Sequence, residues 1–220
     1  MRSGLLLGVA LLAAPAMAQS DKPAEPGWAS AARNGCKVWN SAPRPRESMS
    51  WSGACIKGFA EGHGRVQWYL NGQSADSYDG DMRGGRMDCK GIYTWPNGDR
   101  YVGDFHGNRR NGSGVINFDS GDRYRGDFVD GRQEGTGLYV WRDGDRYEGD
   151  FVDGQPHGKG VYMFIKGGTF EGEWKSGKPN GQGTHRAADG RTYAGLWKNG
   201  CFSQGGQRNA VLVTPKECGF

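Results

Sequence analysis

Aromatic residues and glycines recur at a fixed interval along most of the chain. Six aromatic residues stand 23 positions apart from Tyr78 to Tyr193, and Trp51 opens a related unit 27 positions before Tyr78. The third and fourteenth positions of every unit are glycine, and the fifth position is bulky or apolar. A period of this length is typical of repeat proteins, in which each unit is one small supersecondary element. Seven such units cover residues 51 to about 206.

Each unit has the pattern of two short strands joined by a glycine-rich turn. In the unit that opens at Tyr124, the segment Tyr124–Phe128 is followed by three glycines and then by an apolar segment that ends at Trp141. Aromatic and β-branched runs bounded by glycine predict a β-hairpin. Because side chains alternate along a strand, Tyr124 and Phe128 share one face, and Tyr139 and Trp141 have the matching parity. The glycine between two rings leaves room for the ring of a neighbouring unit or for a close backbone approach.

Stacking is required for such units to be stable. A lone hairpin is marginal in water, so each unit has to cover the aromatic face or the edge of the next. We therefore predict an all-β fold: an elongated, single-layer antiparallel sheet of about seven stacked 23-residue β-hairpin repeats. About thirteen strands at roughly 4.8 Å each would give a sheet on the order of 60 Å long.

The first 18 residues have the features of a secretory signal peptide. Arg2 precedes an apolar run from Leu5 to Ala14, and small residues at positions 16 and 18 form a cleavage site. The run is too short to span a bilayer. We expect cleavage near Ala18 and a mature protein that is periplasmic or secreted. The predicted organisation is a signal peptide (1–18), an N-terminal linker and cap (19–50), the repeat array (51–200) and a C-terminal cap (201–220).

Five cysteines become candidates for disulfides if the chain is exported. Cys36 with Cys55, and Cys201 with Cys218, would each close a loop of fewer than 20 residues near one end of the array. Each bond would contribute about 3 kcal/mol in the chain-entropy model. We expect the first pair to face each other across a hairpin formed by residues 36–39 and 51–55. Cys89 would stay unpaired; a Cys55–Cys89 bond is the main alternative.

Composition and charge exclude several classes of function. The chain has 40 glycines and a mean hydropathy of -0.75, which is unusual for a thick globular core. Its net charge of +4 becomes 27 − 24 = +3 without residues 1–18, and the charges are evenly mixed, so nucleic acid is not an expected partner.

Charged and histidine positions favour neither a metal nor an active site. Arginine and aspartate stand four apart on one strand face, as in Arg100 and Asp104, and are expected to form mutually neutralising ladders across adjacent hairpins. The four histidines fall at four different repeat positions, so they form no catalytic or metal-binding column. We predict no enzymatic activity, no metal and no cofactor.

The repeated pattern Tyr-x-Gly-Asp-Phe-x-x-Gly, followed by Gly-x-Gly and a closing Asp/Asn-Gly, resembles the MORN repeat. The resemblance covers about three quarters of the mature chain. It implies a single-layer twisted sheet of successive hairpins, with roles in protein interaction, scaffolding, dimerisation and phospholipid contact, and it does not imply catalysis. Cys89 departs from the pattern, because it stands where position twelve is usually glycine.

We expect an exported, non-catalytic interaction or scaffold protein that binds protein partners, or a second copy of itself, through its aromatic sheet face. The alternative is an envelope protein whose aromatic rows bind lipid or glycan. For any single ring, packing within a thin core is the competing interpretation. The candidate binding face comprises Trp95, Tyr101, Phe105, Tyr124, Phe128, Tyr139, Trp141, Tyr147, Phe151 and Tyr162.

Overall fold

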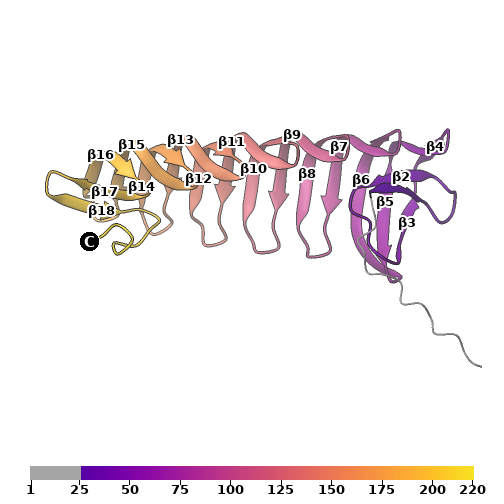
Figure 1. The fold of residues 1–220 in the computed structure, drawn as a ribbon, viewed down its shortest axis with the longest axis horizontal. Helices are drawn as coiled ribbons and strands as arrows, with labels where there is room; N and C mark the ends of the chain where they lie inside the picture. Colours follow the sequence, from indigo (N-terminus) through magenta and orange to yellow (C-terminus); the bar gives the residue numbers. More distant parts are fainter. Residues whose placement is uncertain (1–25) are drawn as a thin grey trace, which may run out of the picture.

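A computed structural model describes residues 26–220 and shows an elongated, open sheet of hairpins (Figure 1). No helix occurs in this part of the chain, and 18 strands form the sheet. The strands in chain order are β1 (Gly27–Ser30), β2 (Lys37–Asn40), β3 (Glu47–Trp51), β4 (Ala54–Ile56), β5 (Phe59–Leu70), β6 (Gln73–Arg83), β7 (Arg86–Thr94), β8 (Arg100–His106), β9 (Arg109–Asn117), β10 (Arg123–Val129), β11 (Arg132–Val140), β12 (Arg146–Val152), β13 (Gln155–Met163), β14 (Gly168–Lys175), β15 (Lys178–Ala187), β16 (Thr192–Lys198), β17 (Cys201–Gln204) and β18 (Gln207–Ala210). The predicted all-β, single-layer antiparallel architecture is confirmed.

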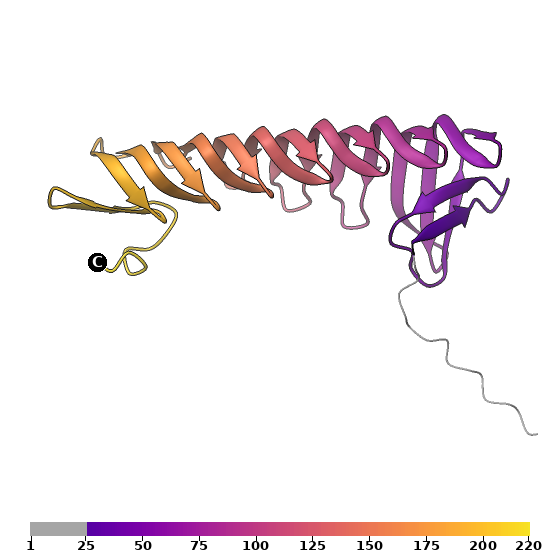
Figure 2. The same ribbon diagram turned by 45° about the horizontal axis from the view of Figure 1, so that its top comes forward.

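Each repeat has the same register. In the unit that opens at Tyr124, strands β10 and β11 pair Tyr124 with Tyr139 and Gly126 with Gly137. The register then shifts between Gly126 and Phe128, which is a β-bulge, and shifts at equivalent places occur in the neighbouring hairpins. A bulge bends its strand and increases the local twist. The hairpins therefore follow one another along the array with the same bend and tilt (Figure 2).

The core contains a continuous row of aromatic rings. The ring of Tyr124 lies edge-to-face between those of Phe128, at 5.3 Å, and of Phe151 in the next unit, at 5.0 Å. Such pairs contribute about 0.5–1.5 kcal/mol each beyond their burial. Each ring of the row is at most 4% exposed. We call this set the ring row, and in spatial order it comprises Tyr78, Phe105, Tyr101, Phe128, Tyr124, Phe151, Tyr147, Trp174, Phe170 and Trp197.

The paired glycines are required by the ring of their own unit. A Cβ atom on Gly126 would lie 2.6 Å from the Cα of Gly137 and 2.5 Å from the hydroxyl oxygen of Tyr124. That hydroxyl donates a hydrogen bond to the carbonyl of Asp127 at 3.0 Å, so the ring is held across both glycines. The expected close backbone approach is therefore present, but the ring above the glycines belongs to the same unit and not to a neighbour. Trp51 occupies the equivalent place in the first unit, against Gly53 and Gly64.

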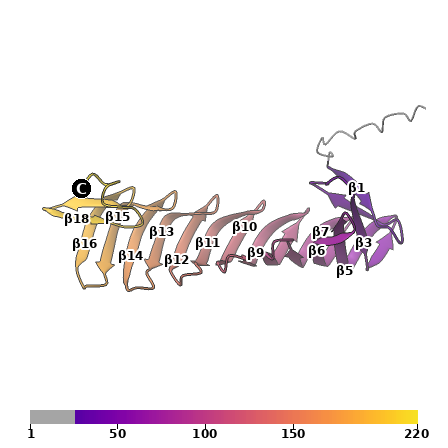
Figure 3. The same ribbon diagram turned by 90° about the horizontal axis from the view of Figure 1, so that it is seen from below.

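Strands outside the repeats flank both ends of the array, and both expected cysteine pairs lie at disulfide distance. The Cα atoms of Cys36 and Cys55 are 5.7 Å apart, and those of Cys201 and Cys218 are 5.5 Å apart. Cys89 is free and exposed. At one end β1 and β2 cross beside the first hairpins, and at the other β17 and β18 extend the sheet (Figure 3).

The expected hairpin between residues 36–39 and 51–55 is wrong. Strand β2 pairs with β1 and, at one position, with β5, whereas β4 pairs with β5. Cys36 directly precedes β2 and Cys55 lies in β4, and these two strands are not paired with each other. One edge of β2 pairs with β1, and on the other edge the backbone N–H groups of Lys37 and Trp39 donate to the carbonyls of Gly58 and Gly85. The segment expected to be a signal peptide lies outside the described residues. Within residues 26–220, no helix is long and apolar enough to cross a membrane.

We predict that Gly126→Ala destabilises its unit by roughly 2 kcal/mol, because an added methyl group overpacks the site where Tyr124 meets Gly137. Hydrogen exchange across residues 124–146, together with the denaturant midpoint, measures this effect. Arg125→Ala is the matched control, since its side chain is exposed. Equal stability of the two variants would show that the close approach is dispensable.

We also predict that the array unfolds in strong alkali. Burial, followed by the charge of Asp104, raises the pKa of Tyr101 to about 12, and burial with the hydrogen bond to Asp122 does the same for Tyr139. A tyrosine whose pKa is raised by folding stabilises the folded state, and this contribution is complete at any pH below the ordinary tyrosine pKa of about 10. That contribution is lost as the pH rises from there towards 12. Tyrosinate absorbance and circular dichroism should change together; tyrosines that all ionise near pH 10 in a folded array would contradict the prediction.

Candidate functional site

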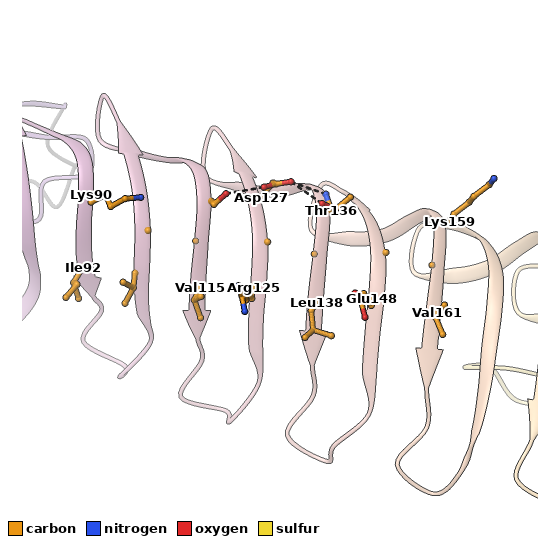
Figure 4. Close-up of a pocket in the computed structure, with 18 of the residues that line it drawn as sticks. Lys90, Ile92, Val115, Arg125, Asp127, Thr136, Leu138, Glu148, Lys159 and Val161 are labelled. Carbon is orange, nitrogen blue, oxygen red and sulfur yellow. Dashed lines mark hydrogen bonds between the residues drawn. The ribbon is translucent and has the colours of Figure 1, made fainter.

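The sheet face opposite the ring row carries a long open groove of about 1610 Å³ (Figure 4). Its floor is the backbone of the paired glycines, which lies between two rows of side chains. The first row comes from positions two and fifteen of the repeat and comprises Asp79, Ile92, Val102, Val115, Arg125, Leu138, Glu148, Val161 and Glu171. The second row comes from positions four and thirteen and comprises His63, Lys90, Ser113, Asp127, Thr136, Lys159, Glu173 and Gln182.

The repeat register keeps both rows continuous. Leu138 on β11 pairs with Arg125 on β10 and with Glu148 on β12, so the first row crosses from strand to strand without a break. These residues flank the glycines in sequence, and alternation along the strand turns them away from the ring row. The same parity that buries the aromatic residues therefore lines the groove.

Acidic side chains at position four of the repeat are hydrogen-bonded to the backbone at position thirteen. Asp127 Oδ2 accepts the backbone N–H of Thr136 at 3.3 Å. The equivalent bonds run from Ser113 N to Asp104 at 3.1 Å, and from Lys159 N to Asp150 at 2.9 Å. Glu173 makes the same contact, with Gln182 N, at 2.7 Å.

The predicted arginine–aspartate ladder is wrong. In residues 26–220, no ion pair joins Arg100 to Asp104 or its equivalents; Asp104 instead lies 2.5 Å from Lys90 Nζ. The reason is the bulge, which turns the position-four carboxylate towards the backbone of its own hairpin.

The side chains of the first row form few hydrogen bonds or ion pairs within the chain. Arg125 and Glu148 flank Leu138, and within the described residues neither forms a side-chain hydrogen bond or an ion pair. Glu171 has one cation nearby, Arg186, whose Nη1 atom is 3.9 Å away. Among the aliphatic side chains of this row, Val102 is 37% exposed and the others are half-buried. These side chains are available to contact another molecule.

The groove is acidic although the chain is basic. Its lining carries five carboxylates, at positions 79, 127, 148, 171 and 173, and three basic groups, at positions 90, 125 and 159, which gives 3 − 5 = −2. The whole chain has a net charge of +4. A ligand of this groove would therefore gain from carrying positive charge.

The sequence-predicted aromatic face lies mostly within the core. Seven of its ten residues are buried, so a partner cannot contact them while the array is folded. These are Tyr101, Phe105, Tyr124, Phe128, Tyr147, Phe151 and Tyr162. Trp95, Tyr139 and Trp141 are half-buried beside the core. Tyr139 and Trp141 also pack on each other at 4.6 Å, and the hydroxyl of Tyr139 donates to Asp122 at 3.1 Å.

The described residues contain no group of three or more histidine, cysteine, aspartate or glutamate side chains placed to hold a metal ion. Partial burial lowers the pKa of His185, whose Nδ1 atom lies 3.2 Å from Asn209 Oδ1. It packs between aromatic rings of the array. The arrangement of this chain suits binding along an extended surface.

Comparison with known proteins identifies the repeat. The family model for the MORN repeat matches five consecutive segments, at residues 78–100, 101–123, 124–146, 147–169 and 170–190. No curated protein sequence matches the chain. One similar solved structure is the TCP domain of SAS-4 (dCPAP) in complex with a proline-rich motif of Ana2 (dSTIL) of Drosophila melanogaster. It is 12% identical, with a TM-score of 0.39, over 82% of this chain and 97% of that chain.

We predict that Asp127→Ala destabilises the array by about 1 kcal/mol, because the backbone N–H of Thr136 loses its acceptor. Glu148→Ala is the matched control in the same groove, since its carboxylate has no such partner. The denaturant midpoint measures both variants. If the denaturant midpoint falls equally in the two variants, the acidic side chains of the second row have no structural role.

Proposed function

Since this chain belongs to the MORN-repeat family, we propose that it is an exported, non-catalytic interaction protein whose groove binds an extended segment of a partner protein. The repeats indicate a repeat-based interaction or scaffold protein, and the family is generally non-catalytic. The observation that carries the proposal is the first row of the groove, whose side chains are accessible and have few partners within the chain. The binding face that we propose is opposite the aromatic face expected from the sequence.

The width of the groove favours an extended segment. Its two rows are separated by two residues along each strand, which is about 7 Å. An α-helix with its side chains is about 10–12 Å wide, so it would rest on the rims and not reach the glycine floor. An extended chain is narrow enough to lie between the rows.

The second row can bind the backbone of such a segment. Position thirteen of successive units is Lys90, Ser113, Thr136, Lys159 and Gln182. The two lysine ammonium groups and the Gln182 side-chain amide have N–H groups to donate, whereas the hydroxyls of Ser113 and Thr136 already donate to Asp127, at 3.4 and 3.3 Å. The segment would run across the strands, whose own backbone groups are already paired. Its carbonyl groups would therefore be bound by side chains, and its apolar side chains would contact the first row.

Export is part of the proposal. It is supported by the signal-peptide pattern of residues 1–18 and by the two cysteine pairs at disulfide distance, since disulfides persist in oxidising compartments. The proposed organisation keeps the linker and cap at 19–50, the array at 51–200 and the C-terminal cap at 201–220. Strand β3 runs across the first of these boundaries and already pairs with β5.

Binding of envelope lipid or glycan through the aromatic face is the alternative. Burial of seven of the ten candidate rings gives it less support, because stacking on a sugar or inserting into lipid requires an exposed ring face.

Panning a random linear peptide library against the disulfide-bonded protein tests the proposal. We expect peptides that bind the native protein and lose at least tenfold in affinity, about 1.4 kcal/mol, on Leu138→Asp. Val129→Asp is the matched control, because Val129 is exposed at the end of β10 and lies outside the groove. Circular dichroism confirms that both variants fold. A library that yields no binder, or binders that tolerate Leu138→Asp, would refute binding in the groove.

A further inference from the structure

The two ends of the groove differ in chemistry. At one end the first row is aliphatic on three consecutive strands, with Ile92 on β7, Val102 on β8 and Val115 on β9. Ile92 pairs with Val102, and Val102 pairs with Val115, so the three side chains form one continuous apolar patch. We call it the aliphatic end.

The other end is acidic. Glu148 on β12 and Glu171 on β14 lie in the first row with Val161 between them, and Glu173 faces them from the second row. The only basic side chain that lines this end is Lys159, so its charge is 1 − 3 = −2. We call it the acidic end.

Only the acidic end has a net charge when the lining residues are counted. Asp79 and Lys90 give no net charge at the aliphatic end, where Lys90 Nζ pairs with Asp104, and Arg125 and Asp127 give none in the middle. The weak contact between Glu171 and Arg186, both more than 60% exposed at 3.9 Å, leaves the Glu171 carboxylate available. Arg125, which has no partner within the described residues, would repel a cation from the middle of the groove.

Resting on the proposed function, we infer that the groove selects a bipartite segment, with aliphatic side chains over β7–β9 and lysine or arginine over β12–β14. The apolar patch would bury the aliphatic part, and the carboxylates of Glu148 and Glu171 would bind the cations.

The distance between the two ends sets the spacing within the segment. From Val102 to Glu148 there are four strand steps, and from Val115 to Glu171 there are five. At about 4.8 Å a step, this separation is roughly 19–24 Å, which an extended chain spans in about six or seven residues.

Fluorescence anisotropy with synthetic peptides tests the inference. The reference peptide carries two leucines and two lysines separated by six serine or glycine residues; one comparison peptide has two spacer residues, and another has glutamates in place of the lysines. We expect the reference peptide to bind at least tenfold more tightly than either, with an affinity that falls as salt is added. On the double variant Glu148→Lys, Glu171→Lys, the preference should reverse in favour of the glutamate peptide.

Asp119→Lys is the matched control for the change of charge, because Asp119 is exposed and outside the groove. It should leave the order of affinities unchanged. Equal binding of all three peptides, with loss on Leu138→Asp, would overturn the bipartite preference and leave the groove as a peptide site. If none of the designed peptides binds while library peptides do, the inference fails alone; if neither set binds, the proposed function fails with it.

Discussion

The close approach of two glycine backbones beneath one aromatic ring is the contact on which the rest of this protein depends. Gly126 and Gly137 can lie side by side only because neither has a side chain, and the Tyr124 ring covers the space that a Cβ atom would need. The tyrosine hydroxyl then satisfies a carbonyl at the bulge. Repeated in successive units, this contact aligns the rings into a row and replaces the second layer that a sheet normally requires for its core.

Much of this organisation was readable from the sequence, because the repeat columns are direct consequences of that contact. Glycine at positions three and fourteen and an aromatic residue at position one identify the units, and even the divergent first unit is recognised by Trp51. The end pairs of cysteines could also be proposed from their positions. The pairing of β2 could not, since its partner β1 lies in a segment with no periodic pattern.

The role of each sheet face was harder to predict. Sequence parity places Tyr124 and Phe128 together, but it does not say whether a ring on a single-layer sheet is covered. The structure shows that neighbouring units provide the cover, through edge-to-face contacts such as Tyr124 with Phe151. The groove was missed for a related reason. Its position-two residues differ from unit to unit, as in Val102 and Glu148, so that position forms no uniform column. Position fifteen is aliphatic in four consecutive units, from Ile92 to Val161, and its parity relative to the glycines is the signal that could have located the groove.

Separation of the two faces gives the array a modular character. The ring row holds the units together, whereas the residues of the first row, such as Arg125 and Glu148, contribute few contacts within the chain. Substitutions in that row can therefore alter one short stretch of the recognition surface without disturbing the packing behind it. Duplication of a unit would lengthen the surface by two strand widths while preserving the register on both sides. The same architecture can thus evolve, or be engineered, to read longer or different polypeptides one hairpin at a time.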